Sequence, residues 1–155
     1  MDTLERAKND LRQGWETPNG ATCACCGQLV KLYKRKFNSS MARDLIALYR
    51  KPDSGFTYYH SEEIAKGNHS SREISRVLHW GLVEEQPNQH DKNKRTSGYW
   101  RITSKGMKFV EGRNEIASHI FIYNQRLYGF SDTNISIHQA LGNKFSYPEL
   151  MGYLI

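Results

Sequence analysis

The chain has 155 residues, enough for one domain with a real hydrophobic core, and its 12% aromatic content indicates a folded protein. Its net charge of +6, with an isoelectric point near 9.3, favours a polyanionic partner. The N-terminus lacks the basic flank and apolar run of a secretory signal, and no apolar run reaches the ~18 residues of a membrane span, which argues against secretion and membrane insertion.

Positive charge is concentrated in two regions. Residues 21–59 hold seven Lys or Arg against two acids, and residues 80–110 hold six against three. The first 20 residues and residues 111–155 each hold three basic and four acidic side chains. Three cysteines lie within four positions, too close to form a disulfide framework, so we expect a reducing, cytoplasmic setting.

Residues 1–37 are predicted to form an N-terminal helix followed by a cysteine-bearing hairpin. Leu4, Ala7 and Leu11 give residues 1–13 an amphipathic pattern that Gly14 would end, unless this terminus frays.

The cysteines suggest a structural zinc site. Cys23 and Cys26 have C-x-x-C spacing, and Gly27 directly after them is typical of a zinc knuckle. A knuckle supplies two of four ligands. Cys25 is a candidate for a third, although adjacent cysteines rarely bind one ion with relaxed geometry, and His60, at the start of a predicted helix, is a candidate for another. The alternative is thiols in a metal-free β-turn.

Residues 29–36 alternate as a strand with a basic edge. Lys34 and Arg35 are therefore candidates for contacts with nucleic acid, either to phosphates or beside stacked bases. The alternative is an edge strand whose lysines prevent aggregation.

Residues 38–112 are predicted to form a winged helix-turn-helix. Ser39 and Ser40 are candidate caps for a first helix, which closes before Pro52, and a turn follows at residues 51–55. A second helix fits residues 61–66, with a turn at Gly67-Asn68. The apolar stripe of the first helix consists of Met41, Leu45, Leu48 and Tyr49.

A third helix is expected from Ser70 or Ser71 to Trp80. Ile74, Val77 and Leu78 share one face, which can bury. The opposite face is that of a recognition helix, or of an ordinary amphipathic helix in water. Its candidate nucleic-acid contacts are Ser70, Ser71, Arg72, Ser75, Arg76 and His79.

Two strands should follow, at residues 81–85 and 99–103, joined by a polar loop. The loop carries Lys92, Lys94 and Arg95, whose charge suits a phosphate backbone. Residues 103–110 then form a short segment with Met107 and Val110 spaced for the core.

The run Gly81-Leu82-Val83, the basic loop, and Tyr99-Trp100-Arg101-Ile102-Thr103-Ser104-Lys105-Gly106 resemble the winged-helix regulators of the MarR kind. In that family, an aromatic-x-hydrophobic-Thr-x-x-Gly run ends the wing and starts the next helix. The resemblance covers residues 41–110 and implies double-stranded DNA binding in transcription control. Winged helices also serve as protein-interaction modules.

Residues 113–155 are predicted to form a hairpin, at 116–123 and 127–130, and short helices at 135–141 and 146–151, which either pack on the core or contact another chain. The expected fold class is α+β. Dispersed residues across the chain also resemble small uncharacterised proteins of phages and prophages, which implies a mobile-element origin. These are residues 27–31, 34–36, 123–124, 129–130, 140–142 and 149–151.

The sequence contains no glycine-rich phosphate loop, nucleophile elbow or His-Glu-x-x-His, so we expect a protein that is not an enzyme. The first functional hypothesis is a double-stranded DNA binder, possibly a homodimer, in transcription or replication control. The second is an interaction protein that binds a host protein complex and uses the winged helix as a scaffold.

Overall fold

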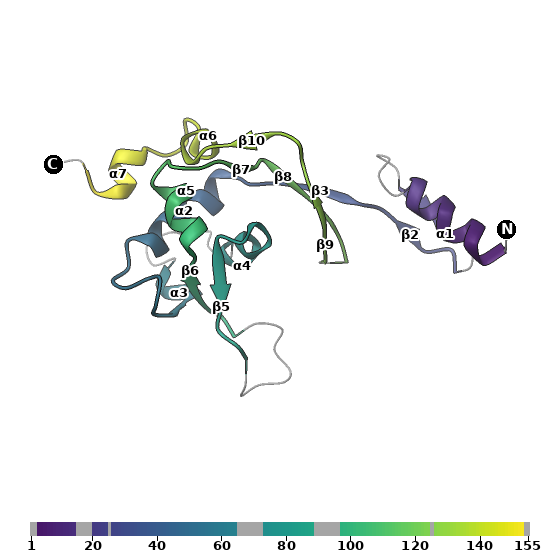
Figure 1. Cartoon of the computed structure of the whole chain (residues 1–155), viewed down its shortest axis with the longest axis horizontal. Helices are drawn as coiled ribbons and strands as arrows, with labels where there is room; N and C mark the ends of the chain where they lie inside the picture. Colours follow the sequence, from purple (N-terminus) through teal and green to yellow (C-terminus); the bar gives the residue numbers. More distant parts are fainter. Residues whose placement is uncertain are drawn as a thin grey trace. The chain divides into compact units, whose positions relative to one another are not determined.

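The computed structural model describes residues 3–14, 20–24, 26–64, 73–88, 97–124 and 126–153. The structure confirms the predicted α+β fold class, and the chain divides into two compact units (Figure 1). Unit 1 comprises Met1–Lys36 and His119–Ser131, and unit 2 comprises Phe37–Ser118 and Asp132–Ile155. Within the described ranges, no helix is long and apolar enough to cross a membrane.

Unit 2 begins with helix α2 (Ser39–Tyr49), which buries the predicted residues Met41, Leu45 and Leu48. The cap prediction was wrong. Asn38, rather than Ser39 or Ser40, is the N-cap, and its Oδ1 accepts a hydrogen bond of 2.9 Å from the Met41 amide. Asn38 has the extended backbone that a cap needs, whereas the serines are already helical.

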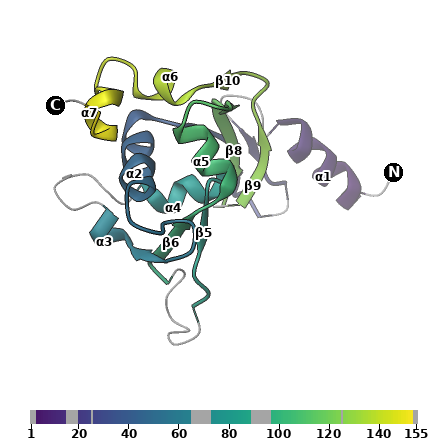
Figure 2. The same cartoon turned by 60° about the vertical axis from the view of Figure 1, so that its left-hand side comes forward.

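The next elements are strand β4 (Tyr59–His60), helix α3 (Ser61–Ile64), helix α4 (Ile74–Val77) and the 3₁₀-helix η1 (Leu78–Trp80). Figure 2 shows α4 beside α2, and the two helices are in contact. The third helix differs from the prediction at both ends: α4 begins at Ile74, with Glu73 as its N-cap, and the last turn of the segment is 3₁₀. In a 3₁₀ turn residues three apart eclipse, so Trp80 follows Val77 into the core while Leu78 is 37% exposed.

Strands β5 (Val83–Glu85) and β6 (Tyr99–Ile102) pair antiparallel, as predicted, and helix α5 (Ser104–Val110) follows. Strand β4 was not predicted, because two residues are too few to show alternation. It pairs with the other edge of β6, giving the strand order β4-β6-β5.

The Thr-x-x-Gly run has a local structural role. Thr103 is the N-cap of α5: its Oγ1 accepts a hydrogen bond from the Gly106 amide at 3.0 Å and donates one to the Gly81 carbonyl at 2.8 Å. A Cβ at Gly106 would lie 2.2 Å from the Leu82 carbonyl oxygen. Glycine therefore allows α5 to approach the backbone at Leu82, directly before β5.

Aromatic side chains fill the core of unit 2. Phe37 packs edge-to-face on Trp80 and Phe109, with ring centroids 5.1 and 5.5 Å apart. The Trp80 indole donates a 2.7 Å hydrogen bond to the Ala117 carbonyl. Phe109, rather than the half-buried Met107, joins Val110 in facing this core.

The C-terminal segment packs on the same unit. Strand β10 (Asn134–Ile135) pairs with β7 (Ile116–Ala117), and helices α6 (Ile137–Leu141) and α7 (Tyr147–Met151) contact α2. Helix α7 begins as predicted, with Ser146 as its N-cap and Pro148 in its first turn. Helix α6 begins two residues later than predicted, because Ile135 belongs to strand β10 and Ser136 is the N-cap. The buried residues Ile137, Leu141 and Met151 extend the core.

Unit 1 contains helix α1 (Thr3–Gly14) and two small sheets. Strand β1 (Ala21–Thr22) pairs with β2 (Leu29–Val30), and β3 (Tyr33–Lys36) pairs with β8 (His119–Tyr123), which also pairs with β9 (Arg126–Phe130). The prediction of one strand over residues 29–36 was wrong, since β2 and β3 belong to different sheets. The predicted hairpin is present as β8 and β9, but its first strand, predicted over residues 116–123, is divided, since β7 pairs with β10 in another sheet.

Candidate nucleic-acid interface

Helix α4 has one buried and one exposed side. Ile74 and Val77 are buried, Ser75 is half-buried, and the Arg76 side chain is 57% exposed. Ser70, Ser71 and Arg72, which precede this helix, lie outside the described residues. Arg76 therefore points to solvent, on the side of the helix opposite the buried Ile74 and Val77, as the sequence predicted.

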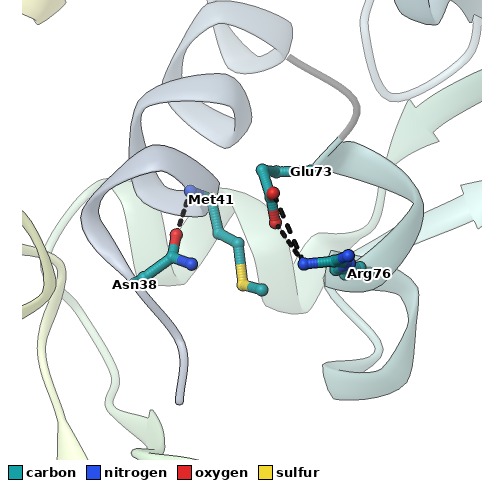
Figure 3. A network of polar contacts seen from close by, with 4 residues as sticks. All are labelled: Asn38, Met41, Glu73 and Arg76. Atoms are coloured by element: carbon teal, nitrogen blue, oxygen red, sulfur yellow. Dashed lines mark hydrogen bonds and ion pairs between the residues drawn. The ribbon is translucent and has the colours of Figure 1, made fainter. Parts of the chain in front are cut away.

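Arg76 is held by an acid of its own helix. Its Nη1 lies 3.4 Å from the nearer Glu73 carboxylate oxygen, and Figure 3 shows this pair near the Asn38 cap of α2. An exposed pair of this length and spacing contributes little to stability, typically well under ~1 kcal/mol. A phosphate or a guanine edge can therefore replace Glu73 as the partner of Arg76 at small cost.

His79 lies one 3₁₀ turn beyond Arg76, so the two side chains follow the same side of the segment. His79 is half-buried, and this burial lowers the pKa of its imidazole. The side chain is thus neutral at pH 7. It suits a hydrogen bond better than the charge contact that a cationic histidine would make.

The root of the loop between β5 and β6 is ordered by polar contacts. The Ser97 amide donates to the Glu85 carboxylate at 2.9 Å, and the Gln86 amide donates to the Tyr99 carbonyl. Arg101 already has two partners: its Nε forms an ion pair with Glu84 at 2.6 Å, and its guanidinium stacks on the Tyr58 ring. Lys92, Lys94 and Arg95, at the predicted tip, lie outside the described residues.

Strand β3 places the other predicted cations, Lys34 and Arg35, on the edge of a three-stranded sheet. All four residues of β3 are exposed. No ion pair found among the described residues involves Lys34, Arg35 or Lys36. These side chains are available to a polyanion.

The two described cysteines lie in the turn between β1 and β2. The Cys23 amide donates to the Gln28 carbonyl, and the Gly27 amide donates to the Cys23 carbonyl, at 2.8 and 2.9 Å. Gly27 has φ +73°, a left-handed conformation that favours glycine. Cys23 is half-buried and Cys26 is exposed, while Cys25 lies outside the described residues. This tight turn fits half of a zinc site.

His60, the proposed further ligand, makes local contacts. Its Nδ1 accepts a 3.2 Å hydrogen bond from the Glu62 amide at the start of α3, and its ring packs edge-to-face on Tyr99. The part of the chain that the structure describes contains no cluster of three or more His, Cys, Asp or Glu side chains able to hold a metal. The described residues thus leave the remaining zinc ligands unassigned.

Sequence reasoning missed Asp44, a buried carboxyl on α2. Burial raises its pKa from 3.8 to about 6, against the opposing effect of Arg43, whose Nε lies 4.0 Å away. The signal was in the sequence: Asp44 stands three residues after Met41 and four before Leu48, on the apolar stripe of the helix.

Comparisons with protein-family models, curated proteins and solved structures find no match to this chain.

Proposed function

We propose that unit 2 is a winged helix-turn-helix that binds double-stranded DNA in the control of transcription or replication. The proposal is supported by the element order from α2 through β4, α3, α4, β5 and β6 to α5, together with the sheet order β4-β6-β5. This is the order in which a winged helix arranges its helices, its sheet and its wing.

The observation that carries the proposal is the exposed Arg76 on a helix whose other side is buried. Ile74 and Val77 fix α4 on the unit, and α4 contacts α2. An arginine on the free side of such a helix can donate two hydrogen bonds to guanine in the major groove. The pair with Glu73 keeps the guanidinium on the surface until DNA replaces the carboxylate.

The predicted wing adds contacts to the phosphate backbone. Strands β5 and β6 bring its two ends together, and the sequence between them carries Lys92, Lys94 and Arg95. Phosphate contacts of this kind position a protein on DNA without reading its sequence. In this proposal the wing cations supply salt-dependent affinity and Arg76 supplies discrimination.

The C-terminal segment, residues 113–155, limits where the second hypothesis, an interaction protein that binds a host protein complex, could act. Ile137, Leu141 and Met151 are buried within unit 2 and are not available to a partner. Among the described residues of this segment, the large apolar side chains that remain exposed are Leu127, Tyr128, Phe130 and Tyr153, and a host protein would have to contact these.

The test is a duplex selected from random sequences, titrated with the protein and with two arginine variants. Arg76→Ala should cost about 1–3 kcal/mol of discrimination at one base pair. Arg113→Ala is the matched control, because Arg113 is also exposed and also pairs with a glutamate, Glu111, at 3.7 Å. Equal losses for both variants, or no duplex binding at about 50 mM salt, would overturn the proposal.

A further inference from the structure

The three-stranded sheet of unit 1 has an unusual charge pattern. Strands β3, β8 and β9 carry four cations, Lys34, Arg35, Lys36 and Arg126, and no acidic residue. Edge lysines alone are commonly a device against aggregation. A sheet whose central strand reads His-Ile-Phe-Ile-Tyr needs a further explanation, because it combines this charge with aromatic rings.

The strand register separates the side chains of the two faces. Antiparallel partners point to the same face, and Lys34 pairs with Phe121, Lys36 with His119, and Tyr123 with Arg126. We call the surface formed by these six residues the aromatic face. The opposite face carries Arg35, Ile120 and Phe130 as one cross-strand row.

Aromatic rings line the central row of the aromatic face. His119, Phe121 and Tyr123 follow one another on β8, and each is half-buried, so part of each ring remains accessible. The direct partner of Phe121 on β9 is Gly129, which has no side chain to place over the ring. The β-bulge beside it adds Tyr128, which is 48% exposed and has its ring centroid 6.4 Å from that of Tyr123.

We infer that the aromatic face binds single-stranded nucleic acid, with bases stacked on Phe121 and Tyr123 and phosphates held by Lys34 and Lys36. The chemistry of the surface specifies this occupant. Flat rings accept the faces of unpaired bases, which a duplex does not offer, and a flanking row of cations follows the phosphates. Burial, together with Lys34 and Lys36, lowers the pKa of His119, so its ring is neutral and can also stack at pH 7.

This inference does not rest on the duplex-binding proposal, because it concerns residues of the other unit. The two activities are separable by ligand. Arg76→Ala should affect the duplex only, and loss of an aromatic ring on β8 should affect the single strand only.

The test uses fluorescence anisotropy with labelled oligo-dT and oligo-rU of about 15 nucleotides, which can span one such sheet. Phe121→Leu keeps an apolar side chain but removes the stacking surface, and it should weaken binding about fivefold or more. Phe130→Leu is the matched control, because it makes the same change on the opposite face of the same sheet, where Phe130 is 48% exposed. It should change affinity less than about twofold.

A second pair of variants tests the cations in the same way. Lys34→Gln should weaken single-strand binding and lower its salt dependence more than Arg35→Gln does, since the two side chains are neighbours on opposite faces. Comparison of the two affinities shows whether the aromatic face prefers RNA or DNA, and either preference supports the inference. Equal effects of the two phenylalanine variants, or no binding of either oligomer at about 50 mM salt, would overturn it. So would an equal weakening of duplex binding by Phe121→Leu.

Discussion

The two units hold their positive charge in different ways. In unit 2 the described arginines near α4 and the β5–β6 strands are paired: Arg76 with Glu73 and Arg101 with Glu84. In unit 1 the sheet of β3, β8 and β9 has four cations and no acid. Net charge alone does not show this difference. In unit 2 a new partner of Arg76 must displace the Glu73 carboxylate, whereas the strands of the sheet in unit 1 hold no acid that competes for their cations.

Metal removal should have the largest effect, and the effect should be greatest at the turn between β1 and β2 of unit 1. We propose that Cys23 and Cys26 hold zinc with ligands from outside the described turn. Structural zinc in a small knuckle is worth about 10 kcal/mol or more of folding free energy. Chelation should therefore raise amide hydrogen exchange in β1 and β2 while leaving α2 and β6 protected. Protein purified without chelator that carries no zinc by atomic emission would contradict this.

Gly106→Ala should destabilise unit 2. The added Cβ would meet the Leu82 carbonyl oxygen at 2.2 Å, so α5 must move away from the backbone at Leu82. We expect a loss of about 3 kcal/mol, measured by urea unfolding. Gly129→Ala is the control, because its Cβ would meet only the Phe121 ring, at an ordinary 4.0 Å. A smaller loss for Gly106 than for Gly129 would contradict the close packing.

Asp44→Asn should remove a pH dependence from unit 2. The folded pKa of about 6 lies above the ordinary 3.8, so the folded state keeps a proton that the unfolded state releases. The free energy of unfolding therefore falls as pH rises from about 4 to about 6. The variant should be more stable than the parent at pH 7, by up to about 3 kcal/mol, and equal or weaker at pH 4. Parallel stability curves for the two proteins would show that Asp44 does not titrate in this range.

Glu73→Gln should have the smallest effect, and it tests whether pairing restrains Arg76. Removing the carboxylate frees the guanidinium 3.4 Å away, so duplex affinity should rise about two- to threefold. Glu149→Gln removes the same charge from an exposed position on α7 and controls for net charge. Equal gains for both variants would mean that the ion pair is irrelevant to binding.

Local patterns predicted much of unit 2. The stripe of α2 and the β5–β6 pair were predicted from the spacing of apolar residues and turn signals, because each depends on residues a few positions apart. The start of α5 at Thr103 was implied by the resemblance to winged-helix regulators. The same reasoning missed β4, which is two residues long, and misplaced Leu78, because the switch from an α to a 3₁₀ turn depends on how Trp80 packs. For the candidate site, the sequence predicted that Arg76 and His79 share the exposed side of one helix. It did not predict that Arg76 forms an ion pair with Glu73.

The sequence by itself determined the helices, the hairpins and the basic composition, since periodicity, caps and turns are properties of short segments. Only the tertiary structure decided that β3 pairs with β8, more than 80 residues away, rather than continuing β2. It likewise decided that Phe121 shares a face with Lys34 and that Asp44 is buried. Strand register and burial depend on contacts between distant segments, and no local pattern of residues specifies them.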